Sequence, residues 1–489
     1  MSFSLLREIV HSQTQESWSK RNEAALNTFF GAPDGRYPKQ ASKVVTLRAP
    51  EMSGDSGVPF AAYIHPQNAT SGPYSGLSFV IFPVPERPCL IGMVIGTQGL
   101  SPDEAILGRP GHARKAQAIC SWLNREYGNG RFVAWAKQDP TRTDLPIPAN
   151  VAKEWPEYKA IFDRYGKEMY ALYCPTEHLA GTDAALTAFL DLLFEERGYE
   201  PLASSQNSYQ SIRASWFDHL MPAVERDAVA DLLSTRRYVI IQGPPGTGKT
   251  RMATELLREI YIGRGRTIQF HPNTTYENFV GGLAPTSIPG ELGFRFTPVP
   301  GFLMEAAAQA LRDPSSNYLL HIDEINRADL GKILGEAIFL LEPTDSDRKI
   351  ELPYDFGGPF HRTFFLPRNL HILGTMNSAD RSIALVDVAV RRRFAFVSLW
   401  PRTSAVEEHG CTVMQKAFQG LISIFVEHAG EDAFSLVPGH SYFLELDESR
   451  AKQSLQVNLV PLLEEYLAQG YVGGFAEPIR GYLQELQSL

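Results

Sequence analysis

The chain has 489 residues, of which 44% are hydrophobic and 21% are charged, and its formal net charge is −9. This length predicts two or three globular domains. The negative net charge excludes a nucleic-acid-binding surface that is basic all around the protein, but not a local basic patch. The four cysteines lie far apart with no Cys-x-x-Cys pair, which favours reduced thiols over disulfides or a zinc knuckle. Because we find no apolar stretch of membrane length and no signal-peptide pattern, we expect a cytoplasmic protein without a membrane segment.

Residues 1–200 are expected to form an α+β recognition domain. In this region, stretches with apolar residues at helical spacing alternate with short continuous apolar runs. The predicted helices are residues 5–30, a stretch that begins after residue 113, residues 152–166 and residues 182–197, and the predicted strands are residues 43–48, 60–64, 77–82, 90–95 and 132–135. The region is long enough to bury a core of its own.

Two features of this domain have both a binding interpretation and a structural one. His112 lies among Arg109, Arg114 and Lys115, which suits a phosphate contact, but a solvated loop that caps a helix is favoured. The tryptophans suit a pocket for a stacked or flipped base, but core packing is favoured for each of them. They are Trp18, Trp122, Trp135 and Trp155.

A phosphate-binding loop opens the second predicted domain, residues 214–400, which follows a polar linker at residues 201–213. An apolar run at 238–242 is typical of a buried parallel strand, and helical spacing follows at 251–261. Between them, GPPGTGKT matches G-x-x-x-x-G-K-[ST], a motif whose glycines let backbone N–H groups wrap a phosphate. The predicted nucleotide-binding residues are Gly243, Pro244, Pro245, Gly246, Thr247, Gly248, Lys249 and Thr250.

Two residues of this motif have more specific roles. Lys249 supplies a cation for the β- and γ-phosphates, and the Thr250 hydroxyl is placed for Mg²⁺. A predicted strand at residues 317–322 then ends in Asp323 and Glu324. We expect Asp323 to hold the water shell of Mg²⁺ and Glu324 to orient and polarise the attacking water. A solvated acidic turn is the alternative, and the phosphate loop upstream makes it less favourable.

A polar tip follows the next predicted strand, residues 370–375. Asn377 fits a contact with the γ-phosphate and the attacking water, and Asp380 either supports this role or caps the next helix. Three consecutive arginines come next, which suit either a solvated face or an arginine finger offered to the nucleotide of a neighbouring subunit. They are Arg391, Arg392 and Arg393.

Three stretches together resemble the McrB family of AAA+ NTPases, the motors of modification-dependent restriction systems. They are GPPGTGKT, IDEINRADLGKILGE at 322–336 and GTMNSADRSIALVDVAVRRRF at 374–394. The segments QFHPNTTYENFVGGLAP, GHSYFL and VPLLEEYL extend the resemblance over residues 216–489. It implies an α/β fold with a P-loop AAA+ core, in which helices flank a parallel sheet, followed by a helical lid at residues 401–489.

The resemblance also implies an activity and partners. It implies a nucleoside-triphosphatase that hydrolyses ATP or GTP with Mg²⁺ in a homo-oligomeric ring, commonly a hexamer. One of the three arginines acts in trans, Asn377 is the first sensor, and Asp380 belongs to the same signature. The N-terminal domain recognises the target, with DNA as the expected ligand, and a separate McrC-like nuclease subunit performs any cleavage.

Two functions from different classes follow. The first is a DNA-targeting motor of a restriction or phage-defence system, which MNSADRS followed by RRRF favours. The second is an ATPase of the MoxR or dynein-related kind that remodels protein partners through its N-terminal domain. The lack of a strong basic patch keeps this second function open.

Overall fold

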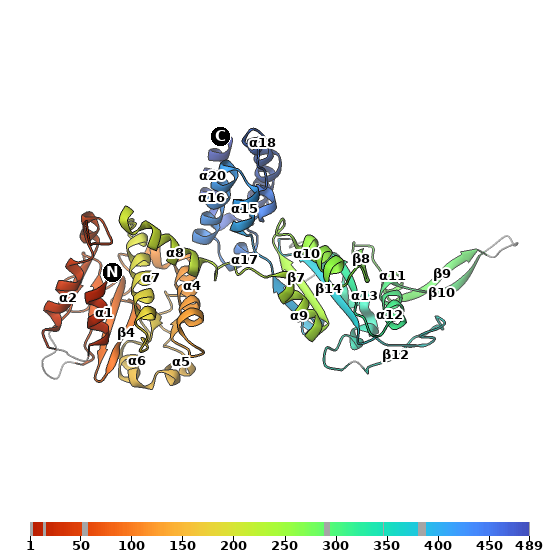
Figure 1. Cartoon of the computed structure of the whole chain (residues 1–489), viewed down its shortest axis with the longest axis horizontal. Helices are drawn as coiled ribbons and strands as arrows, with labels where there is room; N and C mark the ends of the chain where they lie inside the picture. Colours follow the sequence, from red (N-terminus) through yellow and green to blue (C-terminus); the bar gives the residue numbers. More distant parts are fainter. Residues whose placement is uncertain are drawn as a thin grey trace. The chain divides into compact units, whose positions relative to one another are not determined.

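A computed structural model gives the structure of residues 3–12, 16–50, 57–287, 294–345, 347–379 and 388–488. The chain forms two compact units, each with a central sheet. The first unit is Met1–Met221 with Ile424–Gly430, and the second is Pro222–Ser423 with Glu431–Leu489. Figure 1 labels some of the helices and strands of each unit.

The first unit is built on a six-stranded sheet in which neighbouring strands are antiparallel. In spatial order the strands are β1 (Thr46–Arg48), β2 (Ala61–Ile64), β3 (Leu77–Val84), β4 (Arg87–Ile95), β6 (Met169–Tyr173) and β5 (Ala134–Ala136). The helices include α1 (Ser4–His11), α2 (Trp18–Asn27), α4 (Pro110–Tyr127), α5 (Ala149–Glu154), α6 (Lys159–Tyr165), α7 (Leu179–Glu196) and α8 (Gln206–Phe217). The predicted α+β class is confirmed.

Both faces of this sheet are covered. Val80 and Phe82 of β3 share a core with Phe162 of α6. Phe79 and Ile81, which alternate with them, are also buried, and α7 contacts the same strand. Burial on both sides explains why β3 and β4 read as continuous apolar runs rather than as alternating ones.

Two predictions for this unit are wrong in detail. The helix predicted at 152–166 is broken between α5 and α6, because Pro156 lacks an N–H and keeps Trp155 out of the helical region. Strand β6 is not predicted, since a short apolar run does not distinguish a strand from a buried helix. Around the predicted linker, residues 206–217 form α8, which buries Tyr209 and Trp216.

The second unit contains a five-stranded parallel sheet. In spatial order its strands are β15 (Ala395–Ser398), β7 (Tyr238–Gly243), β14 (Leu370–Asn377), β11 (Tyr318–Asp323) and β8 (Gly265–Gln269). The helices around it are α9 (Arg226–Arg236), α10 (Lys249–Glu255), α11 (Tyr276–Phe279), α12 (Phe302–Arg312), α13 (Leu330–Leu334) and α14 (Val388–Arg391). Because the strands are parallel, the carboxyl ends of β7, β14 and β11 meet at one edge.

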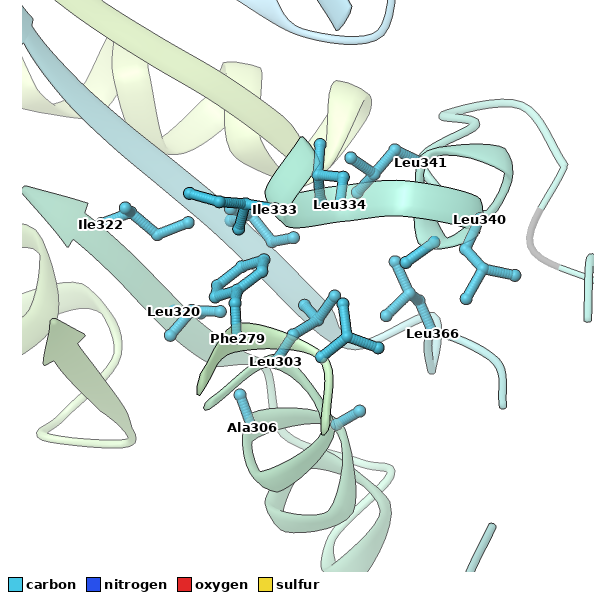
Figure 2. Close-up of a cluster of buried hydrophobic side chains, with 14 of the residues drawn as sticks. Phe279, Leu303, Ala306, Leu320, Ile322, Ile333, Leu334, Leu340, Leu341 and Leu366 are labelled. Carbon is cyan, nitrogen blue, oxygen red and sulfur yellow. The ribbon is translucent and has the colours of Figure 1, made fainter. Parts of the chain in front are cut away.

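Alternate side chains of β7 face two different cores. Tyr238 and Ile240 belong to a cluster with α11, α12 and α13, which Figure 2 shows in close-up. Val239 and Ile241 pack on the other face with α9 and α10. The helices therefore flank the parallel sheet on both sides, and the predicted class of fold is confirmed.

Two hairpins and a set of helices complete the second unit. The hairpins are β9 (Gly281–Ser287) with β10 (Phe294–Pro300), and β12 (Ile350–Glu351) with β13 (Thr363–Phe364). The helices after residue 400 are α15 (Thr403–His409), α16 (Thr412–His428), α17 (Glu431–Phe434), α18 (Glu448–Ser454), α19 (Val460–Ala468) and α20 (Ala476–Ser488). The last residues of α16, from Ile424, belong to the first unit.

The hairpin of β9 and β10 extends from the core of its unit (Figure 1). After Gly282 the glycines and prolines of the sequence predict a loop that runs to about residue 300, and the two strands show that this prediction is wrong. Gly281, Pro285 and Pro298 lie inside the strands, and such residues normally mark turns. Among the residues that the structure describes, no helix combines the length and apolar character needed to cross a bilayer.

Candidate functional site

The phosphate loop connects β7 to α10, which begins at Lys249. Gly246 and Gly248 have φ angles of 81° and 82°, in the left-handed region that favours glycine. The Thr247 hydroxyl donates to the carbonyl oxygen of Pro244 over 3.0 Å and closes the loop. Loops of this kind turn backbone N–H groups toward an anion, so this backbone suits a phosphate.

The side chain of Lys249 is buried inside the loop. Its Nζ donates to the carbonyl oxygens of Gly243 (3.0 Å) and Pro244 (2.8 Å). Burial lowers the pKa of Lys249 from 10.5 to about 8, while the carboxylates of Glu324 and Asp323 act in the opposite direction. The ammonium group is therefore charged at neutral pH and held by neutral carbonyls, which a phosphate can replace.

Asp323 lies at the carboxyl end of β11, beside the loop. The Thr250 hydroxyl donates to Oδ1 of Asp323 over 3.2 Å, and the Thr375 hydroxyl donates to the same oxygen. A hydroxyl and a carboxylate in contact are oxygen ligands of the kind that Mg²⁺ takes next to nucleotide phosphates. The two predicted metal ligands, Thr250 and Asp323, thus lie together and fit this ion.

Glu324 and Asn377 form the polar centre of the site. Asn377 Nδ2 donates to Glu324 Oε1 over 2.8 Å, from the strand beside the acidic one, since β14 pairs with β11. Glu324 has a φ of 53°, an uncommon value for a residue with a Cβ. Arg327 Nε lies 3.5 Å from Glu324 Oε2. One oxygen of the carboxylate therefore accepts a hydrogen bond, and the other forms an ion pair with Arg327.

A segment at residues 435–442, which we call the lid segment, lies directly on the phosphate loop. The N–H of Gly439 donates to the carbonyl oxygen of Pro245 over 2.8 Å, and the N–H of Ser441 donates to that of Gly246 over 3.0 Å. A Cβ on Gly439 would lie 2.0 Å from the carbonyl carbon of Gly246. Glycine is therefore required at this close approach.

A cavity of about 260 Å³ opens beside the loop. Its walls include Glu225 and Arg226 at the start of α9, Arg251 of α10, and part of α15. His440 of the lid segment also lines it. This volume is close to the ~300 Å³ at which pockets for small molecules begin.

The three predicted arginines have different environments. Arg391 is exposed, and its guanidinium carbon lies 5.1 Å from the centroid of the Phe396 ring. Arg392 is exposed, and no hydrogen bond or ion pair within the described ranges holds its guanidinium group. Arg393 is only 7% exposed, and burial lowers its pKa. Asp380 lies outside the described residues.

Comparisons with known proteins agree with this geometry. Residues 238–394 match the AAA domain of the dynein-related subfamily. Over 352 residues the chain is 29% identical to the McrB subunit, EcoKMcrB, of a type IV methyl-directed restriction enzyme of Escherichia coli. That match covers 65% of this chain and 75% of the relative.

A second relative comes from Bacillus subtilis. Over 236 residues the chain is 28% identical to component YdiS of the type II restriction enzyme BsuMI, covering 39% of this chain and 68% of the relative. The chain is a McrB-like AAA+ protein. The resemblance predicted from the motifs is thereby confirmed, and the McrB-like chain is a nucleoside-triphosphatase.

Three contributors to the McrB-like site are not predicted from the sequence. Thr375 precedes Asn377 by two residues, so on a strand both side chains point to the same face, which is a usable signal. Arg327 follows Glu324 by three residues, a spacing that brings side chains together in a helical turn. The contact of Gly439 with the loop has no local signal, because the two segments are far apart in the sequence.

In the first unit of the McrB-like chain, the residues with a binding interpretation are packed. His112 is fully buried on α4, with Nε2 at 2.9 Å from the Tyr170 hydroxyl and Nδ1 at 3.2 Å from Glu196, and burial lowers its pKa to about 3. The solvated loop is therefore a wrong prediction, since a proline starts a helix here. Core packing holds for the buried Trp18, Trp122 and Trp155, and Trp135 is half-buried.

Proposed function

We propose that this McrB-like chain hydrolyses ATP or GTP in a homo-oligomeric ring and is the DNA-targeting motor of a restriction system. The observation that carries the proposal is the bond between Asn377 and Glu324 beside the pair of Thr250 and Asp323. Together these residues provide a water-activating carboxylate and a Mg²⁺ site, both facing one phosphate loop.

Each residue has a role in this proposal. Lys249 and the loop bind the β- and γ-phosphates, and Thr250 and Asp323 hold Mg²⁺, which when bound neutralises charge on the phosphate oxygens. Glu324 orients the attacking water and accepts its proton, and Asn377 fixes the direction of the carboxylate. Phosphoryl transfer needs mainly such positioning and charge.

The proposal assigns the trans cation to Arg392. A finger must reach the nucleotide of the next subunit, so its guanidinium group has to be exposed and uncommitted. Arg392 is exposed without a partner in the described part of the chain, whereas Arg393 is buried and Arg391 stacks on Phe396. An arginine finger is worth about 10³–10⁵ in rate, so hydrolysis depends on assembly.

The restriction role rests on the relatives. One is named as a subunit and the other as a component of a restriction enzyme, and such names fit a motor that works with a separate nuclease. The first unit then serves as the target-recognition module, in line with its separate core. In this proposal the nuclease partner is McrC-like, and ring formation precedes cleavage.

The test measures hydrolysis of ATP and GTP in parallel, at several protein concentrations, with and without methylated and unmethylated DNA. We expect turnover of at least one nucleotide that rises steeply as the ring assembles, and DNA binding at low salt. Absence of turnover with both nucleotides would overturn the enzymatic role. Normal turnover without DNA binding, and without a nuclease subunit that co-purifies, would favour the remodelling of protein partners instead.

A further inference from the structure

The backbone of His440 is fixed above the phosphate loop. The hydrogen bonds from Gly439 to Pro245 and from Ser441 to Gly246 hold the residues on either side of it. The close approach of Gly439 to Gly246 leaves little freedom for a shift. The His440 side chain therefore enters the cavity beside the loop in a defined place.

The imidazole ring of His440 has a defined tautomer. Its Nδ1 accepts a hydrogen bond from the backbone N–H of Arg402 over 3.2 Å. Burial, followed by the charges of Arg402 and Arg251, lowers its pKa to about 4, so the ring is neutral at pH 7. The single ring proton then lies on Nε2, which is a donor.

The Nε2–H group faces the cavity without an acceptor. Nε2 is 3.9 Å from the position that a Cβ on Gly248 would take, so it lies over the last glycine of the loop. Among the described residues, no hydrogen-bond acceptor pairs with it. The Nε2–H of His440 is therefore a hydrogen-bond donor beside the phosphate loop, in a position to bind a ligand.

The walls of the cavity identify which part of a nucleotide it takes. They come from the start of α9, from α10 and from α15. The described lining residues do not include Lys249, Asp323 or Glu324, so the cavity lies at the end of the loop away from the γ-phosphate. The lining instead includes Met252 and Trp400, apolar surfaces that suit a sugar and a base.

We infer that His440 contacts the nucleoside of the bound nucleotide, donating its Nε2–H to a ring nitrogen of the base or an oxygen of the sugar. The inference rests on the proposed nucleotide hydrolysis and adds a residue to its binding site. Both purine nucleotides offer such acceptors, so the contact favours a nucleoside over bare polyphosphate and does not select the base. The lid segment thereby connects nucleoside binding to the phosphate loop.

Two substitutions separate this role from a structural one. A glutamine amide reproduces the Nε2–H donor of histidine, whereas an asparagine amide reproduces only the Nδ1 position. We therefore expect His440→Gln to retain affinity and His440→Asn to lose it. If His440 only accepted the bond from Arg402, the order of the two variants would be reversed.

The experiment is calorimetric titration of the full chain with ADP, GDP and tripolyphosphate. We expect His440→Asn and His440→Ala to weaken the tighter diphosphate about five- to tenfold, as the loss of one hydrogen bond predicts. We expect His440→Gln to stay within about threefold of wild type, tripolyphosphate binding to be unchanged in all variants, and the exposed control His361→Asn to match wild type.

The outcomes are distinct. Unchanged diphosphate binding in His440→Ala, equal losses for tripolyphosphate, or rescue by asparagine rather than glutamine would each overturn the nucleoside contact and leave the proposed hydrolysis intact. A wild-type chain that binds neither diphosphate nor tripolyphosphate would overturn the proposed function itself, and the inference with it.

Discussion

Asn377 donates a hydrogen bond from Nδ2 to Oε1 of Glu324 over 2.8 Å. Glu324 follows β11 and Asn377 ends β14, and the two strands are adjacent and parallel, with Ile322 paired to Gly374. The backbone turns at Glu324, which has a φ of 53°, so the strand does not set the direction of its carboxylate. The direction of the water-activating group therefore depends on the amide beside it.

Substitution of this amide tests that dependence. We expect Asn377→Ala to lower turnover about 10²-fold, since a small misplacement of a reacting group has this effect. Nucleotide affinity should stay within about twofold, because the loop is unchanged. The exposed Asn207→Ala on α8 is the matched control. Wild-type turnover in Asn377→Ala would mean that the bond plays no part in hydrolysis.

A second prediction concerns the pH dependence of binding. Burial holds the pKa of Lys249 at about 8 in the nucleotide-free protein, and a bound polyphosphate raises this pKa because it favours the charged form. Below pH 8 the ammonium is charged in both states, so Lys249 contributes to affinity without making it depend on pH. Above pH 8 binding takes up a proton, so affinity falls by up to about tenfold per pH unit.

Titrations of ADP or GDP between pH 7 and 9.5 measure this effect. The variant Lys249→Ala should bind weakly and show no such decline. An affinity of the wild-type chain that stays level up to pH 9.5 would contradict the lowered pKa of Lys249.

The parts of the site that could be predicted share one property. The loop, the acidic pair and Asn377 each lie at or just after the end of a buried strand. A single short stretch of sequence therefore predicts both the strand and the functional residues at its end. The same local logic predicts the helix that follows the loop. In contrast, the contact of Gly439 with Gly246 joins distant segments, and only the folded chain brings these glycines together.

The hairpin of β9 and β10 shows a second limit of sequence reasoning. Its strands contain Pro285 and Pro298, and its Phe294 and Phe296 are more than half exposed. Neither strand has the burial that normally identifies a strand, so local propensity predicts a loop. The pairing of the two strands with each other decides the structure instead.

The buried pair of Arg36 and Asp191 leads to a stability prediction for the first unit. Their side chains are 4% and 7% exposed, Arg36 Nε donates to Asp191 over 2.7 Å, and the Tyr37 hydroxyl donates to the same carboxylate. Asp191→Ala leaves a buried guanidinium group without its anion, so we expect a loss of about 3–5 kcal/mol in the free energy of unfolding.

Urea unfolding followed by circular dichroism measures this loss. The control is Asp183→Ala, whose partner Arg7 is 20% exposed, and we expect it to cost about 1 kcal/mol or less. Equal midpoints for the two variants would show that the buried pair does not stabilise the first unit.

Complementation between two inactive variants tests most directly whether the site is completed across a subunit boundary. Glu324→Gln lacks the carboxylate but keeps Arg392, and Arg392→Ala lacks the finger but keeps Glu324. We expect each alone to lose at least about 10²-fold in turnover. An equal mixture should recover roughly a quarter of wild-type turnover, since about half of the sites keep Glu324 and about half of their neighbours keep Arg392. A mixture no more active than its components, in rings of normal size, would contradict the shared site.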